Sequence, residues 1–371
     1  PTVTVNEIPK LLRFSPDAAP TPSLHIRQRK LFISELQFLT RYMGQNSIVI
    51  YAGAAPGDHI GYLASLFPEM TFILVDPNPF RIYVEDSYEV TVSTLADEEQ
   101  LLDTLGEEPS AMANIYILQS LFTQKLVDAI ADELTALEGE GNAKDILLIS
   151  DIRTSSGDDE TPTDLDIVWN LAQQYSWIYT LTPRGSLVKF RHPFYNQSID
   201  EFMQLLEDNP QIRADIEIPL EFDSEFRVDF VQNYVDRRLQ FFAGDLNLQA
   251  WPGMYSTETR LMTNGQTVSL YSDDYEERLF YYNAIDRPYV YHENVNADPE
   301  IGFDHCNDCA LENLIWTEYL NAKNIADTVS VKDLVVQLSG PPTNNRKLLF
   351  RNHGKFFTNP ISLDIIKNSI Q

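Results

Sequence analysis

The sequence predicts an α/β protein with a mostly parallel central sheet and helices on both faces. Three short apolar runs, at residues 47–51, 72–74 and 146–149, are typical of strands that are buried on both faces. Stretches with helical signals alternate with such runs, as at residues 100–105 and 163–175, and this alternation is the pattern of parallel βαβ units. We therefore expect a sheet covered by helices on both sides over the first half of the chain.

A glycine or an acid follows each of these three strands. Gly53 comes after the first, Asp76 after the second and Asp151 after the third. Ligands of open α/β sheets bind in the crevice beyond the carboxyl ends of the strands. These three residues are therefore expected to face one crevice, which is the predicted place of the functional site.

Outside the alternating region the sequence predicts an arm and several further helices. Residues 1–22 are rich in proline and lack periodicity, which predicts an extended arm laid over the body of the protein. No linker rich in glycine and serine interrupts the chain, so we expect one elaborated domain over residues 1–371. Helices are predicted at residues 24–43, 198–206, 274–283 and 307–322, and residues 234–242 carry both helix and strand signals.

The chain is strongly acidic, with a formal net charge of −28 from 55 acidic and 27 basic residues. Proteins that hold nucleic acid along an extended surface are usually basic, because they gain affinity by releasing counterions. The charge therefore excludes extended, nonspecific binding of RNA, and we expect no binding of DNA. A recessed site that admits a short RNA end remains compatible with it, provided that a few basic residues converge there.

No apolar run approaches the roughly 18 residues that a membrane-spanning helix needs. The first residues also lack the basic start and apolar stretch of a signal peptide. We therefore expect a soluble, intracellular protein with no membrane contact.

The two cysteines, Cys306 and Cys309, follow His305 closely. A closed zinc site needs four ligands, and one such pair with a neighbouring histidine supplies too few. We interpret the pair as structural thiols in a reducing compartment and predict no metal. A metal or redox role would need partners from elsewhere in the chain.

The stretch from Gly53 to Gly57 brackets a turn between a strand and a predicted helix, where a backbone can approach a ligand closely. Its spacing is neither the dinucleotide pattern nor a phosphate loop, and Pro56 removes an amide that a phosphate would use. Asp76 stands where an acid binds ribose hydroxyls. S-adenosylmethionine, which has an adenosine but no phosphates, fits this combination. The alternative is a tight turn in which Asp58 caps the following helix.

Two lysines stand at informative positions, Lys30 on the first predicted helix and Lys189 in an apolar strand. A single lysine at a strand end ordinarily extends its ammonium group to water and takes no part in catalysis. Together with Asp151 and Glu258, however, the two lysines form the set Lys-Asp-Lys-Glu. This is the catalytic tetrad of RNA ribose 2′-O-methyltransferases of the FtsJ-like type.

The resemblance extends beyond the tetrad and runs over most of the chain. In order, six stretches resemble the poxvirus cap-specific mRNA 2′-O-methyltransferases, which also serve as the small subunit of poly(A) polymerase. The chain is identified as a member of that family from a large DNA virus other than a poxvirus. The six stretches are residues 27–39, 49–63, 146–153, 187–194, 255–261 and 275–283.

The resemblance implies a Rossmann-like methyltransferase fold with S-adenosylmethionine as cofactor. It also implies methyl transfer to the ribose 2′-hydroxyl of the first transcribed nucleotide of 7-methylguanosine-capped mRNA, in the cytoplasm. The implied catalytic residues are Lys30, Asp151, Lys189 and Glu258. The implied cofactor contacts are Gln28, Tyr51, Gly53, Gly57, His59, Asp76, Asn78, Ala96 and Asp151.

Cap recognition is implied for four residues. Phe194 falls on an aromatic residue that stacks against 7-methylguanine, and Glu276 on an acid that reads the edge of the base. Asn196 replaces a second acid beside the stacking residue, and Phe14 is the candidate for the second aromatic plate. Among the cofactor contacts, Asn78 replaces a basic residue and Ala96 a larger aliphatic one, so adenine contacts are expected to differ in detail.

The chemistry requires residues of these types. A ribose hydroxyl is too weak an acid to attack a methyl group at neutral pH, so a base must accept its proton. Lys189 could serve if its pKa falls, which burial and nearby Lys30 favour, whereas Asp151 and Glu258 oppose that fall. Positioning of the hydroxyl in line with the methyl group could therefore contribute more than base strength.

Relative to the poxvirus pattern, extra residues between Phe194 and Glu258 indicate an insertion. The resemblance thus predicts a catalytic core at residues 24–194, an insertion at residues 195–250, and a C-terminal part at residues 251–371 that completes the cap and RNA site. A homodimer or a viral partner, such as a poly(A) polymerase catalytic subunit, could use the insertion. Two other functions stay open: a non-catalytic RNA-binding or processivity subunit, and a cap-independent RNA 2′-O-methyltransferase.

Overall fold

The computed structural model of the chain comprises two units. The sheet unit contains residues 42–246 and 260–273, and the helical unit contains residues 1–41, 247–259 and 274–371. The prediction of one domain over residues 1–371 stays a prediction. The described residues are 27–44, 47–108, 110–154, 162–217, 228–250, 256–287 and 307–338, without the side chains of residues 27–29 and 336–338.

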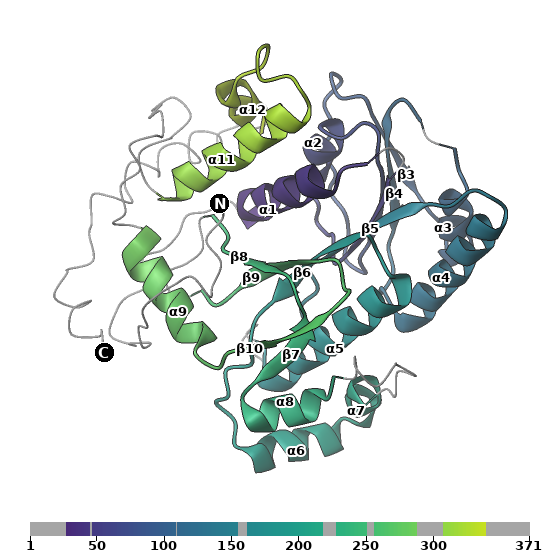
Figure 1. Cartoon of the computed structure of the whole chain (residues 1–371). Coiled ribbons are helices and arrows are strands. Elements are labelled where there is room, and N and C mark those ends of the chain that lie inside the picture. Colours follow the sequence, from purple (N-terminus) through teal and green to yellow (C-terminus); the bar gives the residue numbers. More distant parts are fainter. Residues whose placement is uncertain are drawn as a thin grey trace. The chain divides into compact units, whose positions relative to one another are not determined.

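An eight-stranded, mostly parallel sheet forms the centre of the sheet unit, as predicted (Figure 1). Its strand order is β3-β4-β2-β1-β5-β6-β9-β8, and the neighbours from β3 to β6 pair in parallel. The strands are β1 (Ser47–Ala52), β2 (Thr71–Val75), β3 (Val90–Thr94), β4 (Ala113–Leu118), β5 (Asp145–Ser150), β6 (Gly185–Phe190), β8 (Asp245–Asn247) and β9 (Thr259–Thr263).

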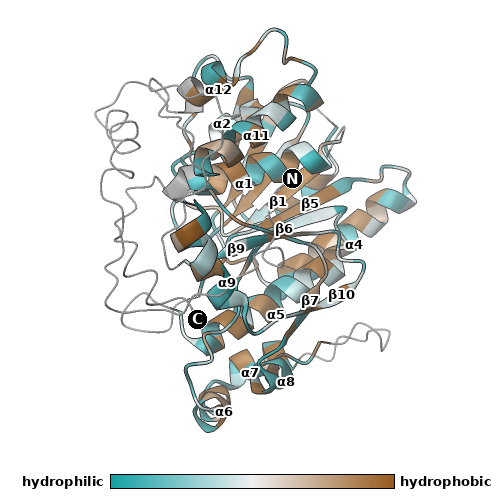
Figure 2. Cartoon of the chain, turned by 60° about the vertical axis from the view of Figure 1, so that its left-hand side comes forward, coloured by the Kyte–Doolittle hydropathy of each residue, from teal (hydrophilic) through white to brown (hydrophobic). Residues whose placement is uncertain are grey.

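The three apolar runs of the sequence form β1, β2 and β5 at the middle of this sheet. Every residue of β1 is buried, and so are all but the first residues of β2 and β5. Figure 2 shows β1 and β5 in hydrophobic colours. Such continuous burial explains why these strands read as unbroken apolar runs instead of alternating ones.

The parallel connections place helices on both faces of the sheet. Because parallel crossovers are right-handed, α2 lies on one face, and α3, α4 and α5 lie on the other (Figure 1). The helices of the sheet unit are α2 (Ile60–Ser65), α3 (Glu98–Leu105), α4 (Gln124–Gly139), α5 (Asp164–Leu181), α6 (Ile199–Asp208), α7 (Pro210–Ile216) and α8 (Phe230–Asp236).

Local sequence signals account for where several of these helices begin. Thr163 forms a capping box at the start of α5, and Ser198 forms one at the start of α6. Asp97 and Thr123 accept hydrogen bonds from the first turns of α3 and α4. Such caps satisfy amide groups that otherwise lack a partner in the first helical turn.

The predicted insertion supplies α6, α7, α8 and β7 (Leu239–Phe242), which pairs antiparallel with β10 (Val268–Tyr271). Its aromatic side chains pack on α5: Tyr175 stacks on Phe242 with ring centroids 4.4 Å apart. Within the insertion, Phe202 stacks on Tyr234 at 3.8 Å. Residues 234–242 contain the end of α8 and all of β7, which explains the mixed signals of that stretch.

The helical unit contains α1 (Arg27–Tyr42, the last residue of which belongs to the sheet unit), α9 (Tyr275–Tyr281), a π-helical turn η2 (Tyr282–Asp286), α11 (Asn307–Ala322) and α12 (Val331–Leu338). Phe32 of α1 meets Trp316 of α11 with ring centroids 5.6 Å apart, and both side chains are fully buried. The helices predicted at residues 274–283 and 307–322 are thus present, and so is the one predicted at residues 24–43 over its described part. No helix in the described ranges is long and apolar enough to cross a membrane.

Candidate active site

The order of the strands reverses between β1 and β5, because β1 is followed along the chain by its neighbour on the other side, β2. Open parallel sheets bind ligands at such a switch point. Gly53 directly follows β1, and Asp151 directly follows β5. The amide of Asp151 donates to the carbonyl oxygen of Ala52 at 3.0 Å, which holds the two strand ends side by side.

Gly53 is required by the closeness of these strand ends. Its φ is +78°, in the region that favours glycine. A Cβ at this position would lie 2.9 Å from both the carbonyl carbon of Asp151 and the amide nitrogen of Ile152. Any side chain at residue 53 would therefore push the end of β5 away.

Gly57 ends the loop in the same left-handed region, with φ +72°. Helix α2 then begins at an N-cap, His59, that makes no side-chain hydrogen bond. The expectation that Asp58 could cap this helix is wrong, because its carboxylate instead accepts a hydrogen bond of 2.7 Å from Nε of Arg81. The amide of Arg81 also donates to the carbonyl oxygen of Pro56 at 2.7 Å, so the loop is held from two sides.

Asp76 connects the glycine loop to the end of β2. Its carboxylate accepts hydrogen bonds from the amide of Ala55 at 3.1 Å, and from the amide and side chain of Asn78 at 2.8 and 2.9 Å. The side chain of Asp76 is buried. The structure therefore brings Asp76 and Asn78 together with the glycine loop, and their contact with a cofactor stays a prediction.

A cavity of about 670 Å³ lies beside these residues, entirely within the sheet unit. This volume falls within the roughly 300–1,000 Å³ that is typical of small-molecule sites. Four of the predicted cofactor contacts line it: Gly53, Asp76, Asn78 and Asp151. Leu121 and Phe122, from the loop after β4, line it as well, although the sequence did not single them out.

Four other predicted cofactor contacts whose positions are described, Tyr51, Gly57, His59 and Ala96, do not line this cavity. Tyr51 is buried within β1, and His59 is buried at the start of α2. Ala96 is exposed after the outer strand β3, and its amide donates to the side-chain oxygen of Gln100. The side chain of Gln28 and the whole of Phe14 lie outside the described residues.

Asp151 and Lys189 form an ion pair, with Nζ of Lys189 2.9 Å from Oδ1 of the carboxylate. Both side chains are largely buried, with exposed fractions of 20% for Asp151 and 17% for Lys189. The carbonyl oxygen of Lys189 accepts a hydrogen bond of 3.0 Å from Gln174 on α5. This bond fixes the strand from which the ammonium group extends.

Arg260 is a third member of this cluster that the sequence interpretation missed. Its Nη2 lies 2.6 Å from the same oxygen, Oδ1 of Asp151, and its side chain is only 3% exposed. The signal available in the sequence was its place two residues after Glu258 in a strand of buried residues. A buried arginine needs an anionic partner, and Asp151 supplies it.

The other two tetrad residues pair within the helical unit. Nζ of Lys30 on α1 lies 2.8 Å from Oε1 of Glu258, with side chains 20% and 14% exposed. Tyr275 holds the backbone before Glu258, because its hydroxyl donates to the carbonyl oxygen of Thr257 at 2.7 Å. Asn283 donates to the carbonyl oxygen of Ser256 at 2.9 Å.

These contacts show a structural role for residues 275–283, one of the six stretches that resemble the poxvirus family. Its first and last residues support the segment that carries Glu258. Glu276 lies between them, in the first turn of α9, and is half-buried. The predicted cap residues Glu276 and Phe194 belong to different units.

Phe194 lies in a loop that is held by a buried carboxylate. Its amide donates to Oδ1 of Asp164 at 2.6 Å, and the hydroxyl of Tyr234 lies 3.0 Å from the other oxygen of Asp164. Burial and the charge of Asp164 raise the pKa of Tyr234 above its ordinary value. The phenol therefore stays protonated and remains a hydrogen-bond donor.

One face of Phe194 already carries a cation. The guanidinium carbon of Arg191 lies 3.8 Å from the centroid of the ring, within the range of cation–π attraction. The following residue, Tyr195, has a φ of +54°, which turns the chain sharply after the ring. Asn196, which stands where the poxvirus family has an acid, is exposed.

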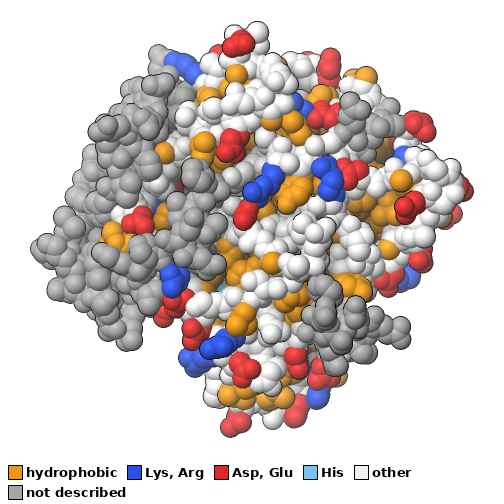
Figure 3. All heavy atoms as spheres, in the orientation of Figure 1, with side chains coloured by type: hydrophobic (Ala, Val, Ile, Leu, Met, Phe, Trp, Pro, Cys, Tyr) orange, Lys and Arg blue, Asp and Glu red, His pale blue; other side chains and the backbone are white. Residues whose placement is uncertain are grey.

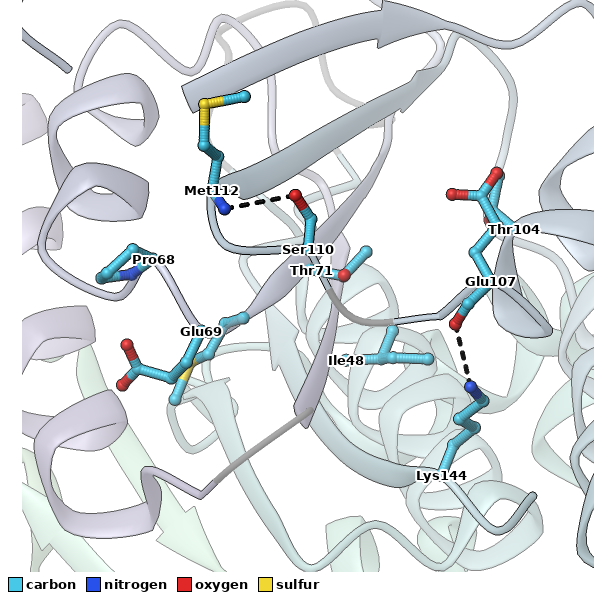
Figure 4. Close-up of a pocket in the computed structure, with 10 residues that line it drawn as sticks. Ile48, Pro68, Glu69, Thr71, Thr104, Glu107, Ser110, Met112 and Lys144 are labelled. Atoms are coloured by element: carbon cyan, nitrogen blue, oxygen red, sulfur yellow. Dashed lines mark hydrogen bonds between the residues drawn. The ribbon is translucent and has the colours of Figure 1, made fainter. Parts of the chain in front are cut away.

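A much smaller cavity of about 20 Å³ lies at the opposite edge of the sheet (Figure 4). Ile48 and Thr71, from the amino ends of β1 and β2, line it. Nζ of Lys144 extends there to the carbonyl oxygen of Glu107 at 2.9 Å. Its volume holds about one water molecule, so it offers no ligand site.

The described ranges contain no group of three or more His, Cys, Asp or Glu side chains that could hold a metal ion. Cys309 is buried, whereas His305 and Cys306 lie outside those ranges. On the face seen in Figure 3, basic side chains lie singly among acidic ones and form no continuous basic surface over the described residues.

Comparison with known proteins gives consistent matches. A family model described as poly A polymerase regulatory subunit matches residues 1–121 and 108–214, together more than half of the chain. The chain is 24% identical over 369 residues to the cap-specific mRNA (nucleoside-2′-O-)-methyltransferase of Myxoma virus (strain Lausanne), covering 94% of this chain and 88% of the relative. The protein of the same description from Fowlpox virus (strain NVSL) is 27% identical over 184 residues, covering 47% of this chain and 49% of the relative.

Proposed function

Because the chain belongs to the family of poly A polymerase regulatory subunits and is similar to poxvirus cap-specific methyltransferases, we propose that it methylates capped mRNA. The methyl group passes from S-adenosylmethionine to the ribose 2′-hydroxyl of the first transcribed nucleotide, in the cytoplasm. The observation that carries this proposal is the buried ion pair of Lys189 with Asp151. Asp151 also lines the cavity to which Asp76 contributes.

The cavity fits the proposed cofactor. Gly53 lines the cavity, and its missing side chain lets the end of β5, which carries Asp151, lie close beside it. Asp76 offers a carboxylate to ribose hydroxyls, while its bonds to Ala55 and Asn78 keep that carboxylate in place. Phe122, Leu121 and Pro77 supply an apolar wall for an adenine.

The cofactor, when bound, supplies an electrophilic methyl group. The residues of the chain orient the acceptor and receive its proton. Asp151 holds the Nζ of Lys189 in position. In its neutral amine form, after its own proton has been lost to solvent, this nitrogen is the proposed acceptor of the proton from the ribose hydroxyl. The family resemblance assigns Lys30 and Glu258 to the same reaction, and their mutual ion pair keeps each in a defined orientation.

For the cap we propose stacking of the positively charged 7-methylguanine on Phe194, with Glu276 bonding to the edge of the base. A cation over an aromatic face gains roughly 1 kcal/mol or more. A carboxylate adds a charge-assisted hydrogen bond. In this proposal Asn196 supplies an amide instead of a second charge, and Phe14 the second aromatic plate.

The test is methyl transfer from labelled S-adenosylmethionine to short RNAs that differ only at the 5′ end. We expect transfer to RNA with a 7-methylguanosine cap, and little or none to uncapped RNA of the same sequence. Equal transfer to both RNAs would instead make the protein a cap-independent methyltransferase. No transfer to either RNA would contradict the proposed catalysis.

The family description favours a second candidate function, that of a non-catalytic subunit of a poly(A) polymerase. The acidic composition disfavours binding of a growing poly(A) tail, because extended binding of RNA depends on a basic surface. Tail length made by the viral catalytic subunit, measured with and without this protein, tests that function separately from methyl transfer.

A further inference from the structure

The cavity of the sheet unit extends beyond the residues proposed for the cofactor. Past Asp151 its wall is formed by Arg153 and Thr154 after β5, by Trp169 and Gln173 on α5, and by Gln211 and Asp215 on α7. None of these residues belongs to the catalytic tetrad or to the predicted cofactor contacts. Helix α7 is part of the predicted insertion at residues 195–250, so the extra segment contributes Gln211 and Asp215 to this wall.

An aromatic ring is fixed in this wall. Nε1 of Trp169 donates a hydrogen bond of 2.9 Å to Oδ2 of Asp215, a residue that lies 46 positions later in the chain. The indole is half-buried and lines the cavity. Because the bond holds the edge of the ring, the orientation of the indole in the cavity wall is set.

Cations and amides also line this cavity. Lys125 and Arg153 line the cavity in a chain with only 27 basic residues. Gln173 and Gln211 carry amide groups that can both donate and accept hydrogen bonds. An aromatic face with cations and adaptable polar groups is the combination with which proteins hold single-stranded nucleic acid.

We propose that this end of the cavity binds a nucleotide of the substrate RNA next to the acceptor nucleotide. The base stacks on Trp169, and Arg153 contacts a phosphate. The inference rests on the proposed function, which places the acceptor ribose at Asp151, on the same cavity. Continuity with Asp151 favours RNA as the occupant over a protein partner.

The test compares capped RNAs of different length. Affinity is measured by calorimetry for a cap joined to one nucleotide and for a cap joined to four nucleotides, with the wild type, Trp169→Leu and Trp169→Phe. Stacking of one base is worth roughly 1–3 kcal/mol, so the wild type should bind the longer RNA at least about fivefold more tightly. Trp169→Leu should lose this gain, whereas Trp169→Phe should keep most of it.

Two further measurements keep the result interpretable. Affinity for S-adenosylmethionine and the midpoint of urea unfolding show whether each variant is folded with an intact cofactor end. Asp215→Asn retains an acceptor for the indole N–H and should behave as the wild type, whereas Asp215→Leu should reduce the gain.

The outcomes separate this inference from the proposed function. If Trp169→Leu keeps the full gain with length, the nucleotide site is overturned even where the wild type methylates capped RNA. If the gain depends on Trp169 but no methyl is transferred, the nucleotide site stands and the proposed catalysis fails. If Trp169→Leu changes only the association with a poly(A) polymerase catalytic subunit, the wall is a protein-docking surface and the RNA inference is overturned.

Discussion

Lys189 and Arg260 donate hydrogen bonds to one and the same oxygen, Oδ1 of Asp151, at 2.9 and 2.6 Å. One carboxylate thus shares its charge between two cations from different strands, β6 and β9. Arg260 is nearly inaccessible, with a side chain 3% exposed, whereas Lys189 keeps 17% of its side chain accessible. Arg260 therefore fixes the carboxylate, and Lys189 is the cation that can reach a substrate.

Lys189→Ala should abolish methyl transfer while affinity for S-adenosylmethionine stays within a few fold, because the lysine acts on the acceptor hydroxyl. Transfer and calorimetry on the same preparation measure both effects. Lys144→Ala is the matched control, since that lysine bonds to Glu107 at the opposite edge of the sheet. Near-normal turnover by Lys189→Ala would make this lysine structural.

Arg260→Met should lower the free energy of unfolding by roughly 1.5–3 kcal/mol, because a charge-assisted hydrogen bond to a largely buried carboxylate is lost. Methyl transfer should fall as well, since Asp151 loses one of its two anchors. Urea unfolding monitored by circular dichroism gives the stability. Arg213→Met removes an exposed pair on α7 and should cost less than about 0.5 kcal/mol. Equal effects of the two substitutions would contradict this role of Arg260.

Asp76→Ala should weaken S-adenosylmethionine binding by about 10- to 100-fold, because charged hydrogen bonds are worth roughly 1.5–3 kcal/mol each. The same carboxylate also holds the amide of Ala55, so part of the loss could come from a loosened loop. Asp58→Ala separates the loss of the ribose contact from the loosening of the loop. It removes the hydrogen bond between Asp58 and Arg81 at the loop and leaves the proposed ribose contact of Asp76 in place. Calorimetry on both variants decides it; unchanged affinity in Asp76→Ala would place the cofactor elsewhere.

The wild type should bind a 7-methylated cap analogue more tightly than the unmethylated one, and Phe194→Ala should erase most of that preference. Arg191→Gln should increase the preference, because the guanidinium now lies 3.8 Å from the ring and competes with the cationic base. Fluorescence titration with both analogues measures the ratio. A wild type that binds both analogues equally would rule out cap recognition by this ring.

Tyr234→Phe should reduce affinity for the methylated analogue by about two- to tenfold, the equivalent of roughly 0.5–1.5 kcal/mol for one hydrogen bond. Its hydroxyl supports Asp164, which in turn fixes the amide of Phe194. Cofactor affinity should not change. Tyr116→Phe, which removes a hydroxyl bonded to Glu107, is the control and should leave cap affinity unaltered. A loss equal in both variants would mean that Tyr234 does not position Phe194.

The sequence by itself determined the sheet and the place of the candidate site. Short continuous apolar runs are typical of strands buried on both faces, and β1, β2 and β5 are such strands. Parallel strands present their carboxyl ends at one edge, so Gly53, Asp76 and Asp151 had to lie near one another. The resemblance identified from six stretches is confirmed by the family match.

Only the tertiary structure decided which partners these residues have. Arg260 reaches Asp151 from 109 positions away, and Asp215 reaches Trp169 from 46 positions away. Asp58 turned out to bond to Arg81 instead of capping α2. Side-chain partners over such separations depend on how the strands and helices pack, and neither local propensity nor spacing along the chain encodes that packing. The sequence therefore located the strand ends, while packing determined which side chains meet there.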